Sequence, residues 1–260
     1  MGLRILFMCL AIAALGKAHK IPSVGIENGK EAKPHSRPYQ VGLSIPVSNG
    51  KRLCGGSLIS EQIVLTAANC LKGRTDPVEI ILGAHNITNP DEDGQVRINS
   101  SSIKIHPDWV QGRPINDIAL IKLPEPVELG DFIQTIKLSQ DNSTNYEGQD
   151  AVISGWGWFS DYFRENSAVL METTLTIKSN FACEVNYLGN IDDNNICVTG
   201  DYGKTACVGD NGSPLVIDDT QVGIFSRKSV LRCDENWPMA YVRVAGFLDW
   251  IDSNSDSSIV

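Results

Sequence analysis

The cysteines constrain this chain more than any other feature of its sequence. The chain has 7 cysteines, and all but Cys9 fall between Cys54 and Cys233. It contains no Cys-x-x-Cys pair and its histidines are scattered, which disfavours a zinc site, the alternative use of such residues. The even number of cysteines between Cys54 and Cys233 is typical of disulfides formed in an oxidising compartment. Spacing alone does not choose among the many possible pairings.

The N-terminal residues favour the same compartment. Arg4 precedes an almost unbroken apolar run over Ile5–Leu15, and small residues follow it. We therefore expect a signal peptide at 1–18, a short leader or propeptide remnant at 19–25, and one secreted, extracellular domain at 26–260. The alternative, a lone anchor helix, is disfavoured because the run is too short to span a membrane.

Composition limits the classes of partner. The formal net charge of −9 disfavours nucleic acids and anionic membrane surfaces as ligands. Hydrophobic residues make up 42% of the chain, enough for a sizeable core. Asn86, Asn99 and Asn142 begin sequons and are candidate glycosylation sites. We expect a monomer without a cofactor or metal, and interpret Asp91–Asp93 as a solvated acidic turn.

The residue pattern indicates an all-β protein with one helix near its C-terminus. Short β-prone runs alternate with turns rich in Gly, Asn, Asp and Pro. The expected strands are Tyr39–Ser44, Ser57–Leu65, Val78–Leu82, Ile118–Lys122, Ala151–Ser154, Leu175–Ile177, Pro214–Ile217 and Gln221–Phe225. Apolar residues from Val244 to Ile251 share one helical face. This pattern alone leaves a β-barrel and a β-sandwich open.

Four motifs narrow the choice. In chain order they are Leu65–Cys70, Asn116–Leu120, Ser154–Gly157 and Gly209–Leu215. In residues, order and spacing they resemble segments of the chymotrypsin-family (trypsin-like, S1) serine proteases, and the resemblance runs from about Ile26 to Ile251.

The resemblance implies a fold and a set of disulfides. The fold would be all-β, with two six-stranded antiparallel β-barrels packed with a cleft between them and a C-terminal α-helix. The implied disulfides are Cys54–Cys70, Cys183–Cys197 and Cys207–Cys233.

The resemblance also identifies the positions of the catalytic groups. Asp117 matches the orienting aspartate, whereas Asn69 stands at the histidine position and Asn211 at the serine position. A carboxamide cannot accept a proton near pH 7, and its nitrogen is a poor nucleophile. Gly209 and Asn211 match the backbone oxyanion donors, which without a nucleophile would be remnants. We therefore predict a degenerate triad.

No histidine is expected to replace the missing base. The candidates are His19, His35, His85 and His106. The resemblance places none of them beside Asn69, and we interpret each as a solvent-facing side chain.

The resemblance also implies an altered specificity pocket and activation site. Thr205 stands at the base of the pocket, and Lys228 and Met239 replace its two wall glycines, so we expect a filled or narrowed pocket. Gly25 precedes the segment that resembles an activated N-terminus, which gives a trypsin-like activator no cleavage site. If cleavage does not occur, buried Asp210 needs another partner.

Two functions from different classes follow. The first is a secreted serine protease homologue without catalysis, a pseudoenzyme that binds another extracellular protein as a cofactor, decoy or effector in a proteolytic cascade or a host or immune setting. The alternative is an active chymotrypsin-like serine endopeptidase. A storage or structural role is a third interpretation. Arg227, Lys228 and Arg232 are a candidate basic partner site, although ordinary solvated loop charges are the favoured explanation.

Overall fold

The computed structural model describes residues 26, 29–75, 77–158, 164–200, 204–228 and 237–255. The predicted signal peptide, the leader, His19, Arg232 and Cys233 lie outside these described residues. No helix within the described ranges has the length and apolar character needed to cross a membrane.

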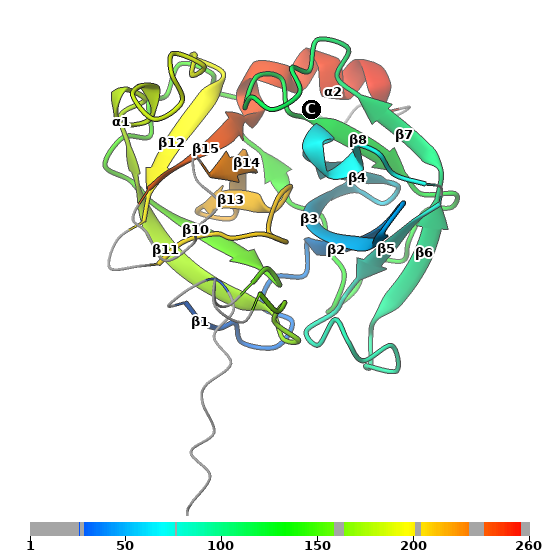
Figure 1. Ribbon diagram of the computed structural model, residues 1–260. Coiled ribbons are helices and arrows are strands. Elements are labelled where there is room, and N and C mark those ends of the chain that lie inside the picture. The colour runs from blue at the N-terminus through cyan, green and yellow to red at the C-terminus, as the bar shows by residue number, and fades with distance from the viewer. Residues whose placement is uncertain are drawn as a thin grey trace, which may run out of the picture.

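Seven strands form the first sheet, on the right in Figure 1. Its elements are β2 (Gln40–Val47), β3 (Gly50–Ser60), β4 (Ile63–Thr66), β5 (Val78–Leu82), β6 (Val96–Ser100), β7 (Ser102–Ile105) and β8 (Ala119–Lys122). The spatial order β6-β5-β2-β3-β4-β8-β7 is antiparallel throughout and curls into a half-barrel. A short 3-10 helix, η1 (Ala68–Leu71), follows β4.

The second sheet closes on itself. Its elements are β1 (Lys30–Glu31), β9 (Lys137–Leu138), β10 (Asp150–Gly155), β11 (Met171–Lys178), β12 (Asn195–Thr199), β13 (Pro214–Ile217), β14 (Thr220–Lys228) and β15 (Pro238–Arg243). Strands β11-β10-β13-β14-β15-β12 are consecutive, and β12 pairs back with β11. The predicted all-β, two-barrel fold is confirmed.

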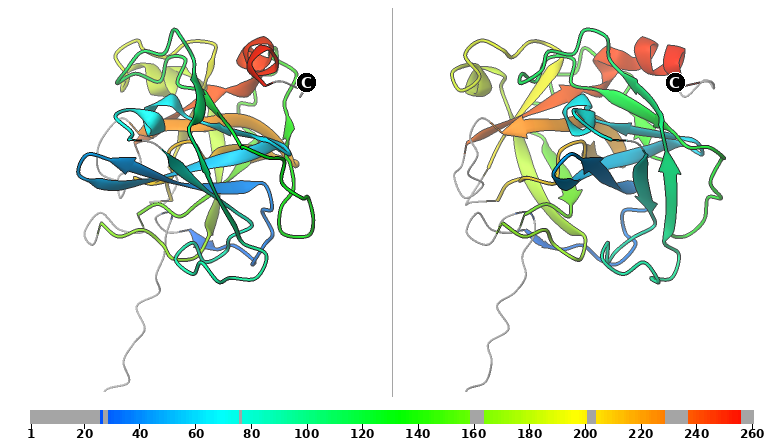
Figure 2. Two further views of the ribbon diagram at one scale, coloured as in Figure 1. Left: turned by 90° about the vertical axis from the view of Figure 1, so that its right-hand side faces the viewer. Right: turned by 45° about the vertical axis from the view of Figure 1, so that its right-hand side comes forward.

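The helices lie at one end of the molecule. They are α1 (Phe181–Glu184), η2 (Val244–Phe247) and α2 (Leu248–Asn254). Figure 2 shows α1 and α2 at the same end, with α2 along the outside of the barrels. Val244, Phe247 and Ile251 are buried in the core of the first barrel, although they follow the last strand of the second. The predicted helical face is therefore correct, and it joins the two barrels.

Several strand predictions were incomplete. The run predicted as one strand over Ser57–Leu65 is the end of β3, a turn, and β4. Ser60 Oγ makes this turn by accepting hydrogen bonds from the backbone N–H groups of Gln62 and Ile63. Strands β6, β7, β12 and β15 were not predicted. In β6 and β7 most side chains are at least partly exposed, which weakens the apolar alternation that marks a strand.

Two predicted disulfides are confirmed, Cys54–Cys70 and Cys183–Cys197. The third, Cys207–Cys233, includes a residue outside the described ranges. Cys54–Cys70 joins β3 to η1, and Cys183–Cys197 joins α1 to β12. Each bridge therefore fixes a short helix to a barrel strand.

The double variant Cys183→Ala/Cys197→Ala should lose about 2–3 kcal/mol of unfolding free energy, because the bridge restricts a loop in the unfolded chain. Guanidinium titration of the variant and the oxidised parent would measure this difference. Phe181→Ser is the matched control, since Phe181 is an exposed α1 residue outside the bridge. Equal midpoints and slopes for parent and double variant would contradict the expectation.

Candidate functional site

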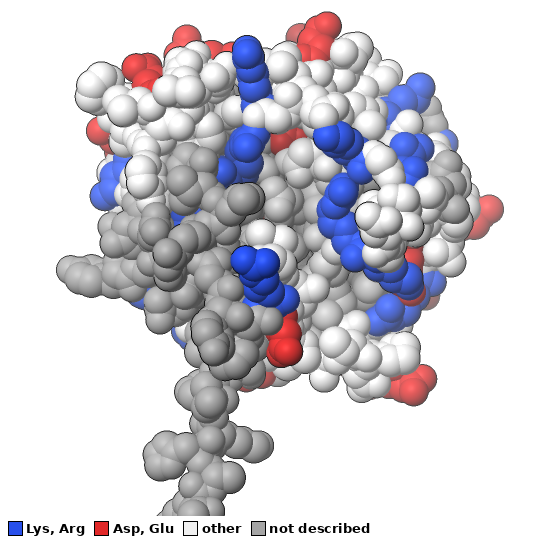
Figure 3. Space-filling view, viewed as in Figure 1, with Lys and Arg blue, Asp and Glu red and all other residues white. Residues whose placement is uncertain are grey.

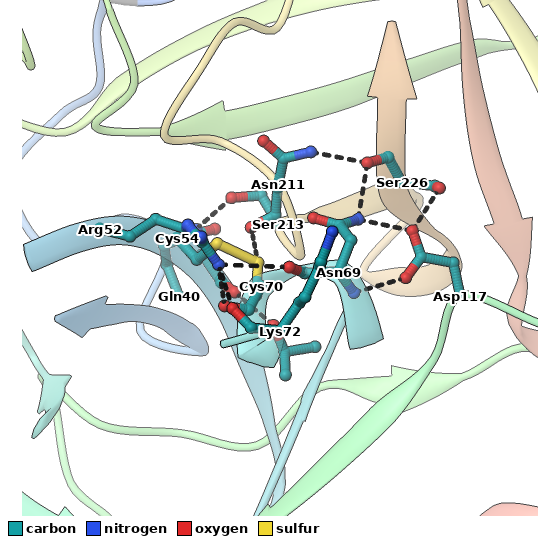
Figure 4. Close-up of a disulfide and its surroundings, with 12 residues drawn as sticks. Gln40, Arg52, Cys54, Asn69, Cys70, Lys72, Asp117, Asn211, Ser213 and Ser226 are labelled. Atoms are coloured by element: carbon teal, nitrogen blue, oxygen red, sulfur yellow. Dashed lines mark hydrogen bonds between the residues drawn. A yellow bond between two sulfur atoms is a disulfide. The ribbon is translucent and has the colours of Figure 1, made fainter. Parts of the chain in front are cut away.

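Three loops bring the predicted site residues together between the barrels. β4 leads into η1, which carries Asn69; Asp117 lies just before β8; and Asn211 lies in the turn before β13. Figure 4 shows that these side chains converge beside Ser226 of β14. Both barrels therefore contribute to the site.

Asp117 is the centre of the hydrogen-bond network. Its Oδ1 accepts from the backbone N–H of Asn69 at 2.7 Å, and its Oδ2 accepts from Asn69 Nδ2 and Ser226 Oγ, each at 2.5 Å. The carboxyl is 1% exposed. Burial raises the pKa of Asp117 above its ordinary value, and the three hydrogen bonds and nearby Arg227 only partly oppose that rise.

The two asparagine amides share one acceptor. The Ser226 carbonyl oxygen accepts a hydrogen bond from Asn69 Nδ2 at 2.9 Å and another from Asn211 Nδ2 at 2.6 Å (Figure 4). Each amide nitrogen thus acts as a donor held in place by the backbone of β14. This arrangement can bridge the barrels, but neither amide can abstract a proton.

The turn that carries Asn211 is packed closely against the first barrel. Gly212 has φ of 85°, and a side chain there would meet Thr66 Oγ1 at 2.2 Å and the Gly55 carbonyl at 2.3 Å. The Asn211 carbonyl accepts from the Gly55 N–H at 2.7 Å. Gly209, the other predicted oxyanion donor, has φ of 102°. Only glycine fits position 212 without moving backbone.

Met239 and Thr205 are in contact under the site. Met239 Sδ lies 3.2 Å from Thr205 Oγ1, and both residues are buried. Met239 is held in β15 opposite Lys228 of β14. The three residues predicted to line a specificity pocket are therefore neighbours, and the Met239 side chain contacts Thr205.

Asp210 is buried without a cationic partner in the described part of the chain. Its Oδ1 accepts from the Gly157 N–H at 2.7 Å, and its Oδ2 from the Cys207 N–H at 2.9 Å. Burial raises the pKa of Asp210 to about 7, and these two backbone hydrogen bonds oppose the rise. Ile26 is fully buried in the second barrel core. In the full-length chain its nitrogen is in a peptide bond to Gly25, so an ammonium group at this point requires cleavage before Ile26.

The histidines were only partly predicted. None of the three in the described ranges contacts Asn69, and the expected solvent-facing position is wrong for His85, whereas His35 and His106 are partly exposed. His85 is 6% exposed, with Nε2 2.9 Å from Glu31 Oε1. The ring of His35 packs edge-on against Phe132. His106 packs against two rings of the C-terminal helical region, Phe247 and Trp250.

The acidic turn over Asp91–Asp93 is closed by hydrogen bonds. The Glu92 carboxylate accepts from the backbone N–H of His85 and of Asn86, at 2.8 and 2.9 Å. Glu92 is thus half-buried and structural, whereas Asp91 and Asp93 are exposed as expected for a solvated turn. Among the residues described, no group of three or more His, Cys, Asp and Glu side chains is arranged to hold a metal ion.

A hollow of about 330 Å³ lies at this site. It is lined by Asn69, Lys72, Trp109, Gln111, Gly112, Arg113, Asp117, Cys207, Val208, Asn211, Phe225, Ser226, Arg227 and Lys228. Sequence reasoning missed the role of Ser226, whose hydroxyl and carbonyl both join the network. Only the two following residues, Arg227 and Lys228, were considered from the sequence, because a backbone acceptor has no signal of its own there.

The fold and site define a two-barrel serine protease architecture with an Asp-centred cleft. A protein-family model described as Trypsin matches residues 26–251. The chain is 40% identical over 232 residues to brachyurin of Leptuca pugilator, covering 88% of this chain and 98% of the relative. It is 37% identical over 237 residues to a chymotrypsin of Phaedon cochleariae, covering 90% and 84%. The chain belongs to the trypsin family.

A solved structure agrees with this assignment. HL collagenase superposes with a TM-score of 0.81 at 32% identity, covering 89% of this chain and 99% of that one. The similarity extends over nearly the whole length of that protease.

Proposed function

We propose that this protein is a secreted, non-catalytic member of the trypsin family that acts by binding another extracellular protein, as a cofactor, decoy or effector. The observation that carries the proposal is the shared acceptor. Asn69 and Asn211 direct their amide nitrogens at one carbonyl, that of Ser226. A protease needs a base and a nucleophile at these two points, and a pair of donors supplies neither.

Two further features support a binding role. Met239 contacts Thr205, the residue expected at the base of the specificity pocket, and a side chain of this length there supports a narrowed pocket. Asp210 lies buried without a cation from any described residue, and Gly25 offers a trypsin-like activator no basic residue after which to cut and create one at Ile26.

An extracellular location is part of the proposal. The two disulfides fit an oxidising compartment. Of the three candidate glycosylation sites, Asn99 and Asn142 are exposed. Asn86 is half-buried, and its Oδ1 accepts hydrogen bonds from the N–H and hydroxyl of Thr88. Attachment of a glycan is therefore easiest at the first two.

The alternative function is an active serine endopeptidase. The enzyme names of the relatives, chymotrypsin and brachyurin, favour it. It would require a base and a nucleophile other than the two asparagine side chains.

Turnover of a mixed peptide library, read by mass spectrometry, separates the two functions. We expect the wild-type protein to give no cleavage above the protein-free blank, because losing one member of such a triad already costs about 10⁴-fold or more. Asn211→Ala is the matched control for a contaminating protease, since contaminant activity would persist in it.

Cleavage by the wild type that disappears in Asn211→Ala would reject the proposal and establish the alternative. The variant Asn69→His/Asn211→Ser restores both reactive side chains. We expect it to remain silent, because Met239 and Lys228 still stand at the pocket-wall positions and Gly25 still offers a trypsin-like activator no cleavage site.

A further inference from the structure

Positive charge gathers at the site of an otherwise acidic protein. Lys72, Arg113, Arg227 and Lys228 line the hollow between the barrels, and we call this surface the cationic groove. Figure 3 shows Lys and Arg side chains bordering the hollow on both sides. Asp117 is the acidic residue in its lining, and it is buried and hydrogen-bonded. The formal charge of the whole chain is −9, so the positive charge of this surface is opposite in sign to the net charge of the protein.

Three of these cations are available to a ligand. Lys72 and Arg113 are exposed and Arg227 is half-buried. None of these three forms an ion pair with any residue that the structure describes. The guanidinium of Arg227 extends toward the other wall, since a methyl group built on Gly112 would lie 4.0 Å from its Nη1. The groove therefore presents unneutralised charge from both barrels.

The cationic groove continues toward α1. A second hollow of about 190 Å³ shares Gly112, Arg113 and Arg227 with the first and is also lined by Asn186 and Leu188. Tyr187 anchors this segment to the groove, because its hydroxyl donates to the Arg227 carbonyl at 2.8 Å. The Cys183–Cys197 disulfide fixes the same segment to β12. The two hollows thus form one firmly held surface.

Large apolar side chains are exposed in the segment that contributes Leu188 to the second hollow. Phe181, Val185 and Leu188 are 72%, 70% and 88% exposed, and we call these three residues the apolar ridge. Such side chains grouped within one short segment are unusual on a monomer surface and mark interaction sites. Glu184 is the acidic residue of α1 and is also exposed.

We infer that the cationic groove and the apolar ridge together bind an extended acidic segment of a partner protein, whose own apolar side chains cover the ridge. The inference rests on the proposed function and names the chemistry of its partner. Complementary charge would steer an acidic segment to this face, because the acidic remainder of the protein repels it elsewhere. A sulfated polysaccharide satisfies the cations equally well but offers no apolar group to the ridge, so the observations favour the peptide.

Fluorescence anisotropy with a defined probe tests the inference. The probe is a fluorescein-labelled peptide with a run of glutamates followed by leucine and phenylalanine. We expect the wild type to bind it at least about tenfold more tightly than the same peptide with lysines in place of glutamates. Binding should weaken steeply between about 50 and about 300 mM salt.

Three variants separate the two parts of the surface. Arg113→Glu/Arg227→Glu should weaken binding at least about tenfold. Phe181→Ser/Val185→Ser/Leu188→Ser should weaken it by about fivefold or more and is not expected to impair folding, because all three side chains are exposed. Lys104→Glu/Lys137→Glu is the matched control, since it changes net charge by the same amount at exposed positions outside the groove. It should bind within about twofold of wild type.

Three results would overturn the inference. They are no binding of the acidic probe by the wild type, equal losses in the groove variant and its control, and an affinity insensitive to the ridge variant. In the last case a heparin-type oligosaccharide that binds through the same arginines would identify a polysaccharide as the ligand instead. Cleavage of the probe by the wild type would defeat the proposed function alone, so the two failures are distinguishable.

Discussion

We expect the unfolding free energy of this protein to fall by as much as about 4 kcal/mol as pH rises from about 4 to about 7, because of Asp210. Burial raises the folded-state pKa of this carboxyl to about 7, against an ordinary value of 3.8. Between these values the folded chain holds a proton that the unfolded chain releases. The unfolded state is therefore increasingly favoured as pH rises, and the loss is complete above about pH 7.

Urea titrations at several pH values would measure this slope in the wild type and in Asp210→Asn. The unfolding free energy of the variant should depend much less on pH. Its amide also faces the N–H groups of Gly157 and Cys207, which lowers the unfolding free energy by an amount independent of pH. Asp117 also has a raised pKa and leaves a slope of the same sign. Asp131→Asn, at an exposed position, is the matched control and should behave as wild type.

The opposite slope would carry a specific meaning. Suppose that the unfolding free energy of the wild type increases through this pH range and that of Asp210→Asn does not. This result would show that a cation stabilises the Asp210 carboxylate. Cleavage before Ile26 would create such a cation as a new ammonium group. The measurement therefore also reports whether the protein remains in an unactivated form.

The sequence predicted which site residues lie close together better than it predicted their hydrogen-bond partners. Asn69, Asp117 and Asn211 could be brought together because each lies in a motif whose place in the fold the family resemblance supplies. The Ser226 carbonyl could not be identified in this way. Its role depends on the path of β14, where the pairing with β15 shifts register between Phe225 and Arg227.

Local polarity misled the interpretation of His85. Its surroundings in the sequence are those of a surface loop, yet its carbonyl accepts from Trp156 Nε1 at 3.0 Å and from the Leu170 N–H at 2.8 Å. Both partners come from distant parts of the chain. Contacts of this kind are set by how the barrels pack, and no local pattern encodes them.

The expected pocket positions were predicted to be neighbours from the family resemblance alone. The structure brings Met239 Sδ and Thr205 Oγ1 into contact and pairs Met239 with Lys228 across two strands. A narrowed pocket stays a prediction. Positions within a known fold are thus easier to infer from a sequence than hydrogen-bond partners are.

The last prediction concerns the present role of Asn69. We expect Asn69→Leu to lower the unfolding free energy by about 3–4 kcal/mol, since it removes one hydrogen bond to a buried carboxylate and one to a buried carbonyl. The lost bonds are those to Asp117 Oδ2 and to the Ser226 carbonyl. Loss of a donor also raises the pKa of Asp117 further, so the deficit should grow as pH rises.

Asn69→His is the informative companion variant. An imidazole N–H can donate to Asp117 as the amide does, so its stability should stay within about 1 kcal/mol of wild type. Chemical denaturation of the two variants in parallel would test this. A small loss for Leu would mean that the amide stabilises little, whereas equal large losses for Leu and His would mean that the site accepts only asparagine. The expected order places the stability of Asn69→His close to wild type and that of Asn69→Leu far below it. This order would show that Asn69 hydrogen-bonds the buried aspartate as a histidine would, although it cannot transfer a proton.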